Sequence, residues 1–189
     1  MLMKALMPDP APDRPCCRLT ATDHSIFPIH STQEAMMADR ASASIRLGGA
    51  LRHSRTPELC RIITAEGLST EWDGAPFEID EIPADRPLEL MADQVRGGTF
   101  EELEAFCVEN GLPFSRSCDP YVGGWDGERL VFDGVGDPRS YRITSNDNVV
   151  MTFAELCDLG TMEAIASHFA AAEIVIPPLS FVGGEADHG

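Results

Sequence analysis

The sequence predicts an α+β domain with a ferredoxin-like core, in which two β-α-β units contribute strands to one sheet. Three observations lead to this fold class. Hydrophobic residues make up 43% and charged residues 24% of the 189-residue chain, which is typical of a globular domain. Segments with strand periodicity alternate with segments of helix periodicity. The same order of elements then recurs 44 residues later, so that Leu59 corresponds to Leu103.

The predicted single domain covers residues 41–182. Residues 1–40 are expected to be a disordered or poorly packed extension, because four prolines crowd its first fifteen positions and its apolar residues show no sustained period. Residues 183–189 are polar and are expected to form a flexible tail.

The first unit begins with a strand at 43–47, where apolar and polar residues alternate. Thr56 and Pro57 then predict the start of a helix, since threonine caps helices and proline suits the first helical position. Gly67 is expected to end this helix in the left-handed conformation. A second strand is predicted over 68–72.

The second unit repeats this order, with a strand at 88–93 and a second strand from 113 to 116. Between them, Thr99 and Glu102 have the spacing of a capping box, and Gly111 predicts the end of the helix. The right-handed crossover rule would place both helices on one face of the sheet. A small three-layer α/β arrangement is the alternative. The helices align without a gap, pairing Leu59 with Leu103, Ile62 with Phe106, Ile63 with Cys107, Gly67 with Gly111 and Leu68 with Leu112.

The remaining residues predict a C-terminal annex of a β-hairpin and a helix. Strands at 129–132 and 140–143 flank glycine- and aspartate-rich turns, which is typical of a hairpin. Thr152 predicts a capped helix that breaks at Gly160 and resumes to about residue 172. Two short strands, 174–176 and 179–182, flank a Pro-Pro pair, which favours an edge position for the last strand.

The charge of the chain restricts its partners. Acidic residues number 31 against 14 basic ones, which gives a formal net charge of −17. Direct nucleic-acid binding is therefore not expected, because phosphate contacts need a basic surface. No apolar run is long enough to span a membrane and no secretory signal is seen, so we expect a cytoplasmic protein without a membrane partner.

The acids concentrate in residues 62–95, where nine of them accompany a single base, Arg86. Within it we predict that the stretch from Glu71 to Glu89, a loop with its flanking strands, binds a basic protein surface. Carboxylates at this density can imitate phosphates and compete for the groove of a nucleic-acid-handling protein. Small acidic inhibitors of restriction and CRISPR systems act in this way, and the likeness is one of composition only. The simpler interpretation is that the acidic surface serves solubility.

The predicted partner-binding residues combine carboxylates with two tryptophans. Trp72 and Trp125 each precede an Asp-Gly pair, and they are either rim residues of the core or interface anchors. The alternatives to a binding protein are a small-ligand regulatory domain and an enzyme whose site forms only in the fold; a homodimer also stays open. The predicted partner-binding set is Glu71, Trp72, Asp73, Glu78, Asp80, Glu81, Asp85, Glu89 and Trp125.

No catalytic residue, metal ligand or cofactor is predicted. Adjacent carboxylates, such as Asp80 and Glu81, point apart on a strand or a helix and do not form an acid–base pair. The six cysteines include no C-x-x-C motif, and the five histidines are scattered, which argues against zinc. Cys60, Cys107 and Cys157 are predicted to be buried thiols on helices, and Cys118 is predicted to lie in a loop.

Overall fold

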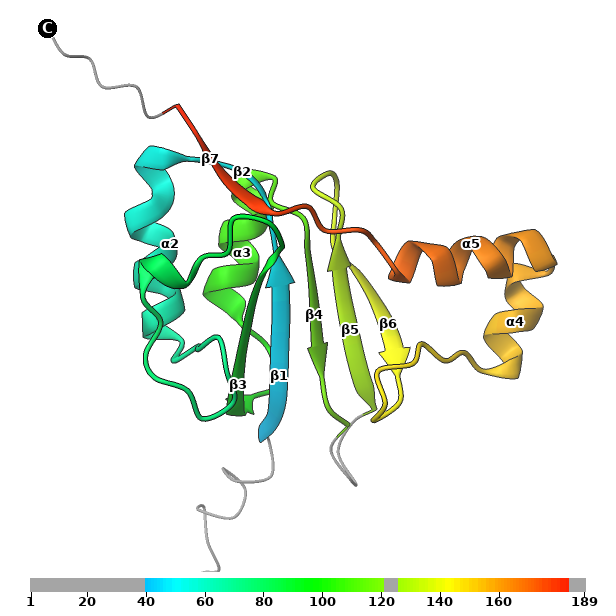
Figure 1. Ribbon diagram of the computed structural model, residues 1–189. Coiled ribbons are helices and arrows are strands. Elements are labelled where there is room, and N and C mark those ends of the chain that lie inside the picture. Colours follow the sequence, from blue (N-terminus) through cyan, green and yellow to red (C-terminus); the bar gives the residue numbers. More distant parts are fainter. Residues whose placement is uncertain (1–39, 121–125, 184–189) are drawn as a thin grey trace, which may run out of the picture. The chain divides into compact units, whose positions relative to one another are not determined.

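The computed structural model describes residues 40–120 and 126–183, which belong to one compact unit. The predicted extension at 1–40, apart from Arg40, and the predicted tail beyond Gly183 lie outside the described residues, so the domain limits stay a prediction. The described part is an α+β fold with a five-stranded antiparallel sheet and four α-helices, as the sequence predicts at this level (Figure 1).

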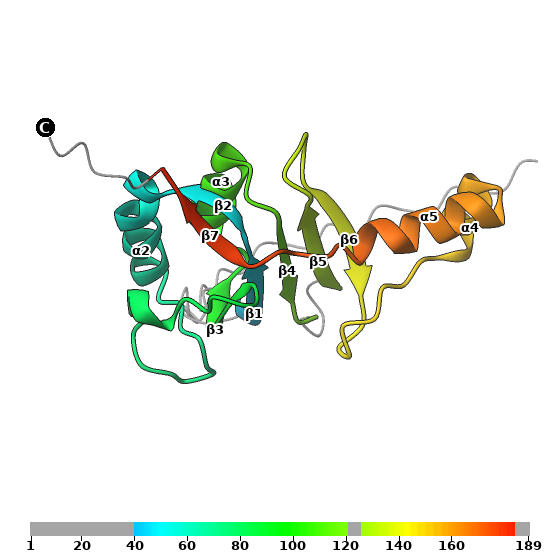
Figure 2. The same ribbon diagram turned by 45° about the horizontal axis from the view of Figure 1, so that its top comes forward.

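The strands of the main sheet are ordered β3-β1-β4-β5-β6. A separate parallel pair joins β2 to the C-terminal strand β7, and Figure 2 shows these two strands side by side. The strands are β1 (Arg40–Leu47), β2 (Gly49–Arg52), β3 (Leu88–Arg96), β4 (Phe114–Cys118), β5 (Gly127–Phe132), β6 (Arg139–Ile143) and β7 (Leu179–Val182). The α-helices are α2 (Thr56–Ala65), α3 (Glu101–Asn110), α4 (Phe153–Leu159) and α5 (Met162–Ala172), and the short 3₁₀ helices are η1 (His53–Arg55) and η2 (Ile79–Glu81).

The two faces of the sheet are covered by different helices. Successive side chains of a strand point to opposite faces, so Phe132 and Val131 on β5 belong to different cores. Phe132 packs with Phe114 in the main core, to which α2 and α3 contribute their buried faces. Val131 packs with Tyr141 and with Ala172 at the end of α5. The C-terminal end of α5 therefore packs on the second face, at the β5–β6 end, while α4 contributes no buried residue.

The predicted correspondence between α2 and α3 holds in their buried faces and ends. Each helix buries the apolar residues at its three corresponding positions. Gly67 and Gly111 both adopt positive φ, 69° and 64°. The next residues, Leu68 and Leu112, are buried and donate their N–H groups back to the helix, which is the Schellman arrangement. The capping box of Thr152 with Glu155 is also present.

The ferredoxin-like arrangement is not confirmed. The strand predicted at 68–72 is wrong: it makes only an isolated bridge between Ser69 and Met91. The first predicted unit therefore lacks its second strand, and the next strand after α2 is β3. Because β3 pairs with β1 in the antiparallel direction, these two strands do not form a β-α-β unit. Only β3-α3-β4 resembles a split β-α-β unit, because β3 and β4 both run antiparallel to the β1 strand between them.

Three smaller predictions also fail. Thr56 does not cap α2, because it is the first residue of the helix and Arg55 occupies the N-cap position without a side-chain hydrogen bond. The segment 174–176 forms no strand. Helix α3 is capped at Phe100, whose N–H donates to the Glu104 carboxylate at 3.0 Å, and not by the predicted Thr99–Glu102 box. Within the described residues, no helix has the length and apolar character needed to cross a membrane.

Candidate functional site

The predicted acidic segment lies in the connection from α2 to β3. We call residues 69–89, which include the first two residues of β3, the acidic loop (Figure 1). Its start is attached to the sheet edge by backbone hydrogen bonds between Ser69 and Met91. In its middle, the Phe77 side chain is buried in the main core, and Ile82 packs against the same core. The loop is thus held at its start by Ser69, in its middle by Phe77 and at its end by the buried Leu88 of β3. Most of the residues between these anchors are exposed.

Hydrogen bonds within the loop shape its tip around η2. The carboxylate of Glu81 accepts from the hydroxyl of Thr70 at 2.7 Å and from the backbone N–H of Glu78 at 2.6 Å. These donors, the Glu78 N–H first, hold the pKa of Glu81 below its usual value. Glu81 therefore acts as an internal brace of the loop as well as a surface charge.

The carboxylates predicted to bind a partner are all exposed, and one loop brings them together. Trp72 is 50% exposed beside them, and so is an apolar residue that the sequence analysis missed, Ile79, at 56%. Trp125 lies outside the described residues. The seven exposed carboxylates are those of Glu71, Asp73, Glu78, Asp80, Glu81, Asp85 and Glu89.

These seven carboxylates differ from most others in the domain in having no basic partner. Across residues 40–120 and 126–183, arginines pair with acidic side chains in many places, for example Arg55 with Glu58 at 3.0 Å and Arg139 with Asp133 at 2.7 Å. No such ion pair within these ranges includes a carboxylate of the acidic loop. The negative charge of the loop is therefore not neutralised by the described part of the chain.

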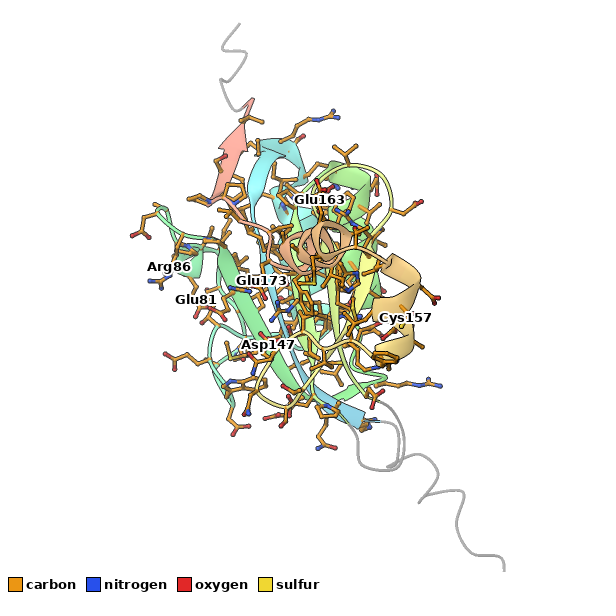
Figure 3. All side chains as sticks on the ribbon, turned by 90° about the vertical axis from the view of Figure 1, so that its right-hand side faces the viewer. Glu81, Arg86, Asp147, Cys157, Glu163 and Glu173 are labelled. Atoms are coloured by element: carbon orange, nitrogen blue, oxygen red, sulfur yellow. The ribbon has the colours of Figure 1, made fainter. Side chains whose placement is uncertain are left out.

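Part of the acidic loop surrounds a hollow of about 350 Å³. Its charged lining consists of Glu71, Glu81 and Glu89 together with Arg86, and Figure 3 shows Glu81 and Arg86 on this side of the molecule. Three carboxylates against one guanidinium leave an excess of negative charge. The hollow thus suits a cationic side chain, such as lysine or arginine, from another molecule.

Two buried arginines, which the sequence analysis missed, fasten the sheet from opposite faces. Arg116 on β4 is 2% exposed and contacts Glu104 of α3 at 2.7 Å and Glu128 of β5 at 2.6 Å. Arg129 on β5 reaches Asp147 at 2.8 Å and Glu173, beyond α5, at 2.5 Å. Each arginine lies two residues along its strand from a buried residue on the same face, Arg116 from Phe114 and Arg129 from Val131. This alternation is the signal that could have revealed them.

Burial affects the carboxylates around Arg116 differently. It raises the pKa of Glu104 above its usual value even though Arg116 is in contact with it. Burial also opposes the charge of Glu128, but hydrogen bonds from Ser140 and Arg116 outweigh this effect and lower its pKa. Both groups serve the packing of α3 and β5 on β4.

Two of the four cysteines in the described residues, Cys107 and Cys118, are buried thiols. Burial raises the thiol pKa values of Cys107 and Cys118, which keeps them protonated at neutral pH. Two predictions are wrong: Cys157 is exposed, because α4 buries none of its residues, and Cys118 is a buried residue of β4. Nor do the described residues contain a group of three or more His, Cys, Asp or Glu side chains placed to hold a metal ion.

Comparison of the chain with models of known families, with curated proteins and with solved structures finds no match. Its function must therefore be inferred from its own chemistry. In the described residues, exposed acids and exposed apolar side chains lie together at the acidic loop and also on α4 and α5, where Phe153 and Met162 are exposed.

Proposed function

We propose that this protein is a non-enzymatic binding protein whose acidic loop engages a basic surface on a partner protein. The observation that carries the proposal is the set of exposed, unpaired carboxylates on a loop that is anchored by Phe77 and braced by Glu81. An anchored loop loses little conformational freedom on binding, so more of the interaction energy contributes to affinity. A basic partner would also relieve the repulsion among neighbouring carboxylates.

The apolar residues of the loop support binding over a role in solubility alone. Trp72 and Ile79 stand exposed between the acids, and tryptophan is enriched at the energetic centres of protein interfaces. The hollow between Glu71, Glu81 and Glu89 offers a place for a basic side chain of the partner. We therefore expect a complex with an apolar centre at Trp72 and a rim of carboxylate–arginine or carboxylate–lysine pairs.

For the partner we propose a protein that handles nucleic acid, which the loop would inhibit by occupying its phosphate-binding groove. Such grooves carry clustered arginine and lysine, whose contacts depend steeply on salt. A cytoplasmic location accords with the free thiols of Cys60, Cys107, Cys118 and Cys157.

The test compares the parent chain with a charge-reversal variant as bait in lysate of the host cells. The variant leaves Glu81 unchanged because this residue braces the loop, and Asp73 unchanged because its φ is positive, 54°. A basic protein should be captured by the parent, lost between about 50 and 300 mM salt, and displaced by duplex DNA. The loop variant, which should not capture it, combines Glu71→Lys, Asp80→Lys and Asp85→Lys.

A matched control changes the net charge by the same amount away from the loop. It should capture the partner like the parent, because its substitutions lie outside the proposed interface. If loop and control variants capture the same proteins equally, the acidic loop is not the binding site. If DNA does not displace the partner, the mimicry of nucleic acid fails while protein binding stands. The control combines Asp119→Lys, Asp137→Lys and Glu163→Lys, all at exposed carboxylates without a described ion pair.

A further inference from the structure

A second hollow, independent of the acidic loop, lies between β6 and the α4–α5 pair. Its volume is about 320 Å³, at the lower end of the range of small-molecule sites. The apolar part of its lining comprises Tyr141 on β6, Val150 and Met151 in the segment that follows β6, and Leu159 at the end of α4. His168 of α5 completes it, with its ring centroid 5.0 Å from that of Tyr141 in an edge-to-face arrangement.

This hollow exists because the α4–α5 pair packs on the sheet only at its C-terminal end. Helix α4 has no buried residue, and Ala172 is the one buried residue of α5. Arg129 fixes that end by donating to the carbonyl oxygen of Ala172 and to Glu173. Away from this attachment, the side chains of Val150, Met151 and Leu159 are only partly buried, which leaves apolar surface for a ligand to cover.

Polar groups converge on one side of the hollow. The backbone of Arg142 points away from β5, because its carbonyl accepts from the Val150 N–H, and the same edge of β6 carries the backbone of Ser140. The carboxylates of Glu155 and Asp158 also line the space. The guanidinium of Arg142 contacts Asp126 at 3.0 Å and Glu155 at 3.6 Å, so its charge is already balanced by acids.

From this arrangement we infer that the hollow is a binding site for a small organic cation, an amine attached to an apolar or aromatic body. The body would cover Val150, Met151 and Leu159 and lie against the Tyr141–His168 ring pair. The ammonium group would approach Asp158, the lining carboxylate that has no ion pair within the described residues, and the exposed edge of β6. A ligand with a carboxylate in place of the amine would face the carboxylates of Glu155 and Asp158. The one arginine of the lining, Arg142, is already in contact with acids, so such a ligand is disfavoured.

The experiment uses 2-phenylethylamine as the probe, with 3-phenylpropanoate and 2-phenylethanol as anionic and neutral molecules of similar size. Each is titrated into the full-length chain labelled with ¹⁵N, and amide shifts are followed. The amine should shift the resonances of Tyr141, Val150, Leu159 and His168 and bind most tightly, and the alcohol should bind more weakly at the same residues. The anion should bind weakest or not at all. Amide shifts that miss these residues, or an anion that binds as tightly as the amine, would overturn the inference.

Variants separate the charge from the fold. Asp158→Asn should weaken binding of the amine about three- to fivefold, the effect of one partly exposed ion pair, and leave binding of the alcohol unchanged. Glu155→Gln should act in the same direction, and it keeps the capping box because glutamine can also accept from the Thr152 N–H. The control is Glu163→Gln, on α5 outside the hollow (Figure 3). Equal affinity of the amine for Asp158→Asn, Glu155→Gln and the control would refute a site selective for cations.

Discussion

Replacing Arg116 by methionine is the sharpest test of how the sheet is held together. Methionine retains much of the aliphatic volume of arginine and removes the guanidinium that lies between Glu104 and Glu128. Arg116 is almost fully buried, and the side chains of its partners are 15% and 37% exposed. The substitution would thus leave two carboxylates near the core without their common cation.

The expected loss is large because removing one partner of a buried ion pair leaves an uncompensated charge, which costs about 3–5 kcal/mol. A domain of this size is typically stable by about 5–15 kcal/mol, so Arg116→Met should remain folded but be clearly weakened. Adding Glu104→Gln removes the more buried charge and keeps an oxygen for the Phe100 N–H. The double variant should therefore recover about 1–3 kcal/mol of the loss.

The loss should also depend on pH in a defined direction. Burial already raises the pKa of Glu104, and the loss of Arg116 should raise it further. A carboxyl whose pKa is higher in the folded than in the unfolded state stabilises the fold when protonated, and this stability disappears as the pH rises through the folded-state pKa. Arg116→Met should thus be more destabilising at pH 8 than at pH 5.

Urea unfolding at both pH values, followed by circular dichroism, measures these differences. Arg139→Met serves as a matched control, since Arg139 pairs with Asp133 at 2.7 Å but both side chains are about half exposed. That variant should lose less than about 1 kcal/mol. If Arg116→Met costs no more than the control, or if Glu104→Gln gives no recovery, the buried network does not stabilise the sheet as we infer.

Two further predictions concern the contact between Glu66 and the start of α3, and the pairing of β7 with β2. Glu66→Gln should raise the free energy of unfolding at pH 8 and have little effect near pH 4. Burial, aided by two nearby glutamates, raises the pKa of Glu66, and glutamine can still accept from the first N–H groups of α3. A variant that is less stable than the parent in urea at pH 8 would contradict this. Gly48→Ala should separate β7 from β2, because a Cβ there would lie 1.8 Å from the carbonyl oxygen of Pro177. Hydrogen exchange should become faster at the β7 amides. Unchanged protection would show that the segment before β7 can move aside without cost.

The helices were predictable from sequence because their signals are local. A glycine at the helix end, a proline in the first turn and the Thr152–Glu155 spacing each act within one turn of backbone. The exception at α3 is instructive. Glu66 accepts from the Glu102 N–H, as Thr99 was expected to do, and Glu104 accepts from the Phe100 N–H. Local rules thus locate a helix to within a residue or two, and leave its exact cap to neighbouring side chains.

The strand order was not predictable in the same way, because pairing depends on residues far apart in sequence. The alternating apolar and polar residues at 68–72 predicted a strand. In the structure the same residues form a loop that buries Leu68 and leaves the sheet after one bridge. The buried arginines show the same limit. Arg116 ends a predicted strand, and only the approach of Glu104 from α3 and Glu128 from β5 makes its burial tolerable.

The acidic site was partly predictable, since charged side chains at high density are seldom buried, and all seven carboxylates are exposed. Composition could not show that Glu81 braces the loop, or that Phe77 anchors it. The hollow beneath α4–α5 was missed entirely. Its lining comes from β6, the segment after it and both helices, and no motif connects these residues in the sequence.

The distribution of arginines explains why none of the seven carboxylates of the acidic loop has an ion pair within the described residues. Those at 55, 61, 116, 129, 139 and 142 form ion pairs with acids elsewhere in the domain. Arg86 is the one base of the loop, and it shares a hollow with three carboxylates. A surface that served solubility alone would gain nothing from an exposed Trp72 and Ile79 among its acids, because exposed apolar residues promote association. Their position on an anchored, negatively charged loop favours a specific basic partner.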